Sequence, residues 1–130
     1  MKRKHLFMVL ALVTLFAVSA WAANTVTTDA GTIKIVPDGT TDWAWTSLAG
    51  ANANGLVVYS IQFNPSAAND VLILHNGGID GVEVFNSGPA GGTAPIIKYY
   101  PQGKVIRLVF DASDCTFSVA ANASIFVETN

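Results

Sequence analysis

The sequence is poor in cysteine, histidine and charge. Its 130 residues include one cysteine and two histidines, and only 12% of them are charged. A single cysteine excludes an intrachain disulfide, which many small secreted domains use to compensate for a small hydrophobic core. A site built from several cysteine and histidine ligands, as zinc requires, is disfavoured for the same reason. The chain must therefore obtain its stability from a packed core, from a partner or from self-association.

Basic residues are also scarce, and three of the seven lie at positions 2–4. An apolar run follows at residues 6–18, and a bilayer-spanning helix would need about 20 such residues. Ala20 and Ala22 then supply the small-residue pattern of a signal-peptidase site. We predict a secretory signal peptide at residues 1–22, cleaved before Ala23. The protein is then exported to the cell surface, the periplasm or the medium, without a stable membrane anchor.

Cleavage would leave 108 residues with four basic side chains against nine acidic ones, a formal net charge of −5. Binding to nucleic-acid phosphates needs a cluster of cations, so a nucleic-acid partner is not expected. The remaining length suits a single domain. We expect an extended N-terminal arm at residues 23–31 and one β-domain at residues 32–130.

Apolar and polar residues alternate along most of this domain, as they do in half-buried strands. In LVVYSIQFN the alternation places Val57, Tyr59, Ile61 and Phe63 on one face. Other expected same-face sets are Ile33 with Ile35, Val82 with Val84, Ile106 with Leu108 and Phe110, and Ile125 with Val127. Glycine, proline and asparagine separate these segments, which is typical of tight turns. The pattern predicts a single small antiparallel β-sandwich of seven to eight strands, either a jelly roll or an immunoglobulin-like Greek key.

No motif in the sequence indicates an enzyme. The chain lacks a nucleophile elbow, a phosphate-binding loop and an HExxH helix. After the signal segment the only histidine is His75, 40 positions from Cys115, and no thiol-hydrolase signature surrounds the cysteine. We predict a non-enzymatic protein without a cofactor.

Cys115 lies between two acidic residues in FDASDCTFS. Neighbouring carboxylates raise the pKa of a thiol, so we expect a small buried apolar residue rather than a nucleophile. An intermolecular disulfide is the alternative. Asp111 and Asp114 of this segment, together with Asp38 and Asp42 of PDGTTD, could bind calcium through loop carboxylates. The simpler interpretation is that these carboxylates cap backbone N–H groups in turns.

Aromatic residues give a second set of candidates. Trp43 and Trp45 are two positions apart, so an extended chain would place both rings on one face. They could belong to the core, to an assembly interface, or to a stacking platform for glycans. Tyr99 and Tyr100 would point to opposite faces, leaving one of them exposed. The Asn122 sequon matters only in a host that glycosylates proteins.

Few outward charges protect the expected strands from pairing with another chain. Low charge, apolar strands and the absence of a disulfide favour a protein that associates with other proteins, first of all with itself. The leading hypothesis is an exported structural subunit of a surface, filament or virion-like assembly. A glycan-binding module is the first alternative, and a calcium-stabilised extracellular domain is the second.

Two segments, IQFNPSAANDVLILHNG and IIKYYPQGKVIRLVFDASDCTFS, resemble small β-sandwich proteins among the structural genes of tailed phages. The shared features are an F-N-P-x-A-x-D-V-L strand–turn–strand and an aromatic-rich strand followed by D-x-S-x-C-T. The resemblance spans about residues 56–128 and implies a structural role without catalytic residues. Virion parts assemble in the cytoplasm, whereas this chain begins with a predicted export signal. A secreted relative of such proteins, serving as a surface or filament subunit, reconciles the two features.

Overall fold

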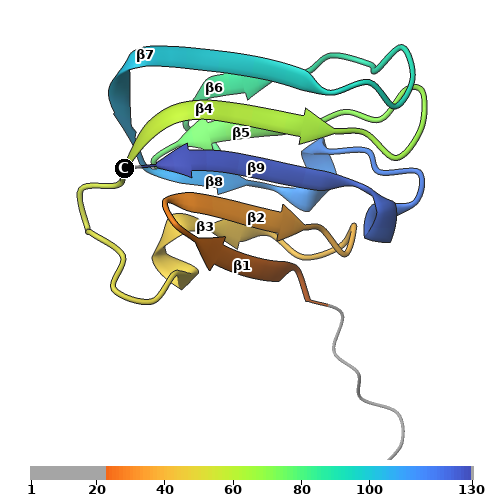
Figure 1. Ribbon diagram of the computed structural model, residues 1–130. Coiled ribbons are helices and arrows are strands. Elements are labelled where there is room, and N and C mark those ends of the chain that lie inside the picture. The colour runs from red at the N-terminus through yellow and green to blue at the C-terminus, as the bar shows by residue number, and fades with distance from the viewer. Residues whose placement is uncertain (1–22, 130) are drawn as a thin grey trace, which may run out of the picture.

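A computed structural model of the protein describes residues 23–129, which form two antiparallel sheets packed face to face (Figure 1). The first sheet has the order β1 (Thr25–Asp29), β2 (Thr32–Val36), β9 (Ser124–Thr129), β4 (Leu56–Asn64) and β7 (Ile96–Ile106). The second has the order β3 (Trp43–Ala44), β8 (Leu108–Phe110), β5 (Ile73–Asn76) and β6 (Val82–Asn86). Three single 3₁₀ turns lie between strands: η1 (Trp45–Ser47), η2 (Ala112–Asp114) and η3 (Ala120–Asn122). The predicted small all-β sandwich is confirmed, but the described part of the chain has nine strands rather than the predicted seven to eight.

The core forms where regular alternation brings apolar residues between the sheets. Ile35, Ile125 and Val127 are fully buried, and Ile33 is 4% exposed, as the alternation predicts. Lys34 lies on the outer face between the two isoleucines of β2. Burying a side chain of this size contributes about 1.5–3 kcal/mol. The pairing of β2 with β9 is therefore stabilised mainly by the core rather than by charge.

The expected alternation fails in β4, where a β-bulge interrupts the pairing between Val58 and Ser60. Val58 is fully buried, whereas Val57 is 42% exposed. On the neighbouring strand β7, residues 100–103 all lie opposite Tyr59 alone, so the edge of the sheet loops outward there. A bulge shifts every residue on one side of it to the other face. The prediction that Val57 shares the buried face of Ile61 and Phe63 is therefore wrong.

β6 shows a similar shift, because its pairing with β5 is irregular between Leu74 and His75. Val84 and Phe85 are both buried, while Val82 is 77% exposed. The predicted same-face pair of Val82 and Val84 is thus wrong.

The alternation of KVIRLVFD predicts one strand, but the segment forms parts of two. It changes sheets at Arg107, because β7 ends at Ile106 in the first sheet and β8 begins at Leu108 in the second. Ile106, Leu108 and Phe110 are nevertheless fully buried, as predicted.

The N-terminal segment predicted to be an arm belongs to the sandwich. β1 forms a hairpin with β2 through Ala30 and Gly31, which have φ values of 44° and 84°. Two consecutive positive φ angles match the twist of a two-residue hairpin. The Asn24 side chain also donates to the Thr41 carbonyl oxygen at 2.8 Å. The predicted signal peptide, with Ala20 and Ala22, lies outside the described residues, and within residues 23–129 no helix is long and apolar enough to span a membrane.

Candidate interaction surface

The two tryptophans do not form the exposed pair that an extended chain would give. Trp43 in β3 is 4% exposed and stacks on Phe110, with 6.3 Å between the ring centroids. The chain leaves the extended conformation after Ala44 and enters η1, so Trp45 is turned away and half-buried. The Nε1 of Trp45 donates to the Asn52 carbonyl oxygen at 2.9 Å. Trp43 and Trp45 therefore cannot act together as a flat platform for glycans.

The two tyrosines of β7 have different environments. Tyr99 is 67% exposed on the outer face of the five-stranded sheet. The Tyr100 hydroxyl donates to the Val84 carbonyl oxygen of β6 at 2.8 Å, and burial raises the pKa of Tyr100. The Lys98 Nζ donates to the same oxygen at 2.7 Å. Both bonds join the edge strand of one sheet to the edge strand of the other, which leaves Tyr99 as the exposed ring of the four predicted platform residues.

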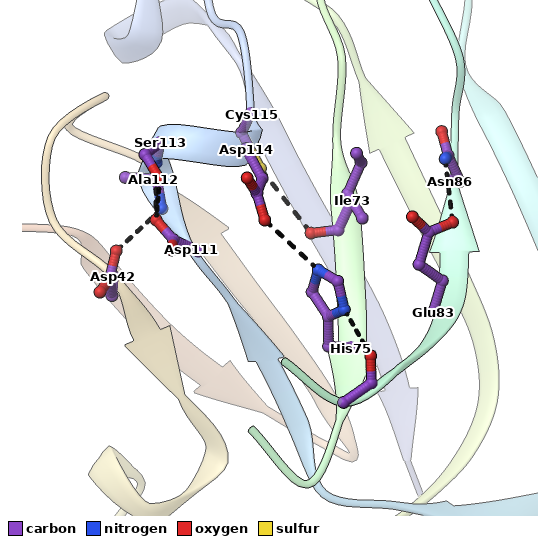
Figure 2. A network of polar contacts seen from close by, with 11 residues as sticks. Asp42, Ile73, His75, Glu83, Asn86, Asp111, Ala112, Ser113, Asp114 and Cys115 are labelled. Carbon is purple, nitrogen blue, oxygen red and sulfur yellow. Dashed lines mark hydrogen bonds and ion pairs between the residues drawn. The ribbon is translucent and has the colours of Figure 1, made fainter. Parts of the chain in front are cut away.

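Asp38 and Asp42, predicted as possible calcium ligands, accept backbone hydrogen bonds. Asp38 Oδ1 lies 2.7 Å from the backbone nitrogens of both Thr40 and Thr41. Burial opposes ionisation of Asp38, but the hydrogen bonds outweigh it and lower its pKa. Asp42 Oδ1 accepts from the Ala112 N–H at 2.9 Å, which fastens the β2–β3 loop to η2 (Figure 2).

Asp111 is brought next to Asp42 by this contact and acts as the N-cap of η2 (Figure 2). Its Oδ1 accepts from the Ser113 hydroxyl at 2.6 Å and from the Ser113 N–H at 2.8 Å, and these bonds lower the pKa of Asp111. Within residues 23–129, no three His, Cys, Asp or Glu side chains gather closely enough to hold a metal ion. Calcium binding stays a prediction, and the geometry favours the capping interpretation.

His75 and Cys115 have separate partners, as Figure 2 shows. His75 is 7% exposed, and its Nδ1 lies 2.9 Å from the Gly81 carbonyl oxygen and its Nε2 3.7 Å from Asp114 Oδ2. The Cys115 thiol donates to the Ile73 carbonyl oxygen at 3.7 Å. In this arrangement the imidazole does not activate the thiol.

Cys115 packs against the core, as predicted for a buried apolar residue, but it is only half-buried. Burial raises the pKa of the Cys115 thiol to about 11, the carboxylates of Asp114, Asp111 and Asp42 add to the rise, and the bond to Ile73 opposes it. The predicted direction is confirmed, although burial is a larger cause than the carboxylates. An intermolecular disulfide stays a prediction.

Asp70 is a polar centre that the sequence does not single out. It is fully buried, and its Oδ2 accepts from the Ser66 hydroxyl at 2.6 Å and the Ser66 N–H at 2.7 Å. Its Oδ1 accepts from the Ser118 hydroxyl at 2.7 Å and the Ser118 N–H at 2.8 Å. Burial opposes ionisation, but these bonds outweigh it and lower the pKa of Asp70 to about 2. The only signal in the sequence is a serine four residues before an aspartate, so the more distant partner could not be foreseen.

The outer face of the β4–β7 pair carries a cluster of exposed apolar side chains. Val57 lies opposite Val105, and they are 42% and 56% exposed. On the other side of the outward loop, Tyr99 and Ile97 occupy the next outward positions of β7 and are 67% and 42% exposed. We call these four residues the β4–β7 patch. Among the residues that the sequence offers as binding candidates, only Tyr99 belongs to it.

Comparison with known proteins gives no relative for this chain: no family model, no curated protein and no solved structure matches it.

Proposed function

We propose that this protein is an exported, non-enzymatic structural subunit that works by assembling with other proteins, first of all with copies of itself. The observation that supports this function best is the β4–β7 patch. Its four side chains are large, apolar and between 42% and 67% exposed, although many other apolar side chains of the chain are buried in the core. Exposed apolar side chains gathered on one face of a sheet can mark a protein–protein interaction site.

The composition of the patch fits an interface between proteins. Tyr99 supplies a large ring with a polar end, the type of residue that is enriched in interface centres. Val57 and Val105 are β-branched and lose little side-chain freedom on burial. Ser60 and Gln62 lie on β4 opposite Tyr99 and Ile97, so polar groups border the apolar ones.

The lysines of β7 do not lie on the patch. Lys98 donates to the Val84 carbonyl oxygen, and its Nζ lies 5.5 Å from the centroid of the Tyr100 ring. Lys104 Nζ lies 5.9 Å from the same centroid. Both cations of β7 are thus occupied on the side of the strand that faces β6, away from the outer face that carries the patch.

A pair of matched substitutions tests this function. Val105 in the patch and Val119 in the β8–β9 connection are 56% and 50% exposed, so replacing each with threonine changes surface polarity by a similar amount. We expect the unaltered protein to show a mass above the monomer by light scattering, increasing with concentration. Val105→Thr should lower that mass, and Val119→Thr should leave it unchanged.

A protein that remains monomeric at millimolar concentration and forms no particles in electron micrographs would contradict the proposal. Equal effects of Val105→Thr and Val119→Thr would contradict the assignment of the patch.

A further inference from the structure

Each sheet of the sandwich has two edge strands, and the four edges differ in how they are protected. Within residues 23–129, β1 and β7 are the edges of the five-stranded sheet, and β3 and β6 are the edges of the four-stranded sheet. The outer backbone groups of an edge strand can pair with another chain. Natural proteins suppress such pairing with charged side chains, above all lysine, and with proline, bulges or very short strands.

Three of the four edges carry such protection. β7 contains Pro101, two lysines and the outward loop at residues 100–103. β6 has an irregular register and exposes Glu83. β3 is two residues long.

β1 is less protected, because its only feature of this kind is the charge of Asp29 at its last position. Its sequence TVTTD contains neither proline nor lysine, and its five residues pair with β2 without a register shift. Threonine and valine favour the extended conformation. Val26 packs against the core and holds the strand in place, while the other four residues are exposed. β1 is therefore the edge best prepared to pair with another strand.

The pairing of β2 shows which backbone groups of β1 are available. The Thr129 N–H of β9 donates at 2.6 Å to the carbonyl oxygen of Gly31, the residue just before β2. Because backbone direction alternates along a strand, the other odd-numbered positions, 33 and 35, also direct their N–H and C=O groups toward β9. The alternation of an antiparallel ladder then directs the even-numbered positions of β2 toward β1. Thr25, Thr27 and Asp29 face those positions, which leaves the N–H and C=O groups of Val26 and Thr28 pointing away from the sheet.

We propose that β1 pairs antiparallel with β1 of a second copy, centred on Thr27. In this register Val26 faces the partner's Thr28, and both have outward backbone groups, so the pair can exchange two hydrogen bonds. By the twofold symmetry, Thr28 faces the partner's Val26 and forms a second pair of the same kind. In a register shifted by one residue, the outward N–H and C=O groups of one strand would face residues whose own backbone groups point back into their sheet, so these hydrogen bonds could not form.

The charge of the strand favours the same register. With Thr27 at the centre, Asp29 faces the partner's Thr25, and the two Asp29 positions lie at opposite ends of the ladder. At about 3.4 Å per residue, four positions separate them by roughly 14 Å along the strand. This exceeds the Debye length of about 8 Å at physiological salt. A register centred on Asp29 would instead oppose two like charges.

The result is a twofold-symmetric sheet of ten strands that crosses the interface. This inference rests on the proposed role in assembly, because it names the partner and one contact of that role. The β4–β7 patch lies at the far side of the same sheet from β1 and remains free for a different contact.

Disulfide trapping tests the register. In a non-hydrogen-bonded antiparallel pair the Cα atoms are about 4.5 Å apart, within the range that a disulfide can bridge. In a Cys115→Ser background, Thr27→Cys should give a covalent dimer on mild oxidation. Thr25→Cys is the matched control, because its copies would lie about 14 Å apart in this register and should not cross-link.

A proline substitution tests the pairing without a cross-link. Thr28→Pro removes an N–H group that points away from β2, so the monomer should keep its fold, as its circular dichroism would show. We expect Thr28→Pro to reduce the dimer fraction measured by sedimentation, whereas Thr28→Val, which keeps the N–H group, should not.

Cross-linking confined to position 27, together with loss of dimer in Thr28→Pro, would support β1 pairing. Absent or equal cross-linking at positions 25 and 27 in a protein that still self-associates would overturn β1 pairing and leave the assembly function standing. A protein that is monomeric in every form would overturn both.

Discussion

Replacing Asp70 with asparagine should destabilise the protein in a pH-dependent way. The carboxylate is fully buried and accepts hydrogen bonds from two serines on different connections. An asparagine side chain at this position would retain one acceptor oxygen and place an NH₂ group against donors. A pKa lowered from 3.8 to about 2 corresponds to about 2 kcal/mol of stability at neutral pH. For a domain of this size, about 2 kcal/mol lowers the melting temperature by about 10 °C.

The sign of the pH dependence follows from the direction of the shift. The folded-state pKa is below the unfolded value, so the unfolded chain binds the proton first as the pH falls. The contribution of Asp70 is complete above about pH 4 and is lost between about pH 4 and pH 2. The stability difference between the unaltered protein and Asp70→Asn should therefore shrink as the pH falls through this window.

Urea unfolding at pH 7, 4, 3 and 2 measures this difference directly. Because Asp38 and Asp111 also have lowered pKa values, the relevant quantity is the difference between the two proteins at each pH. Asp80→Asn, a substitution of an exposed acid, is the matched control and should change stability by less than about 0.5 kcal/mol. A difference that is absent at pH 7, or equally large at pH 7 and pH 2, would refute the reasoning.

Further predictions concern single side chains and the N-terminus. Tyr100→Phe removes the bond to the Val84 carbonyl oxygen and should cost about 1 kcal/mol of unfolding free energy by urea titration; no loss would mean that this contact contributes nothing. Trp43→Ala empties a buried position and should cost about 3–5 kcal/mol, and a change below about 1 kcal/mol would contradict its place in the core. The Cys115 thiol, with a pKa of about 11, should react slowly with a thiol reagent at pH 8 and quickly after unfolding, whereas equal rates would show an accessible thiolate. Expression of the full sequence in an exporting host should yield a protein whose mass begins at Ala23, and an uncleaved chain would argue against the signal peptide.

Much of the sandwich follows from alternation, and its failures have physical causes. Ile33, Ile35, Ile125 and Val127 lie where alternation places them, because β2 and β9 pair without interruption. Val57 does not, because the bulge beside it depends on the neighbouring strand, which inserts residues 100–103 opposite a single position. A pattern read along one strand contains no information about such an insertion in another.

The candidate site was harder to predict than the fold. Trp43 and Trp45 would share a face in an extended chain, but η1 begins at Trp45 and separates them. Asp70 resembles an ordinary turn aspartate until Ser118, 48 residues away, is placed beside it. The β4–β7 patch likewise depends on which strands become neighbours.

The position of β9 also affects how the chain can fold. The last strand in the sequence lies in the middle of the five-stranded sheet, between β2 and β4 (Figure 1). Until residues 124–129 are available, no strand joins the β1–β2 hairpin to the β4–β7 pair. Pairing between distant segments is slow, because a long loop must close first. A nascent chain would therefore remain without a complete five-stranded sheet until residues 124–129 are made, and such an incompletely folded chain would suit the export that we propose.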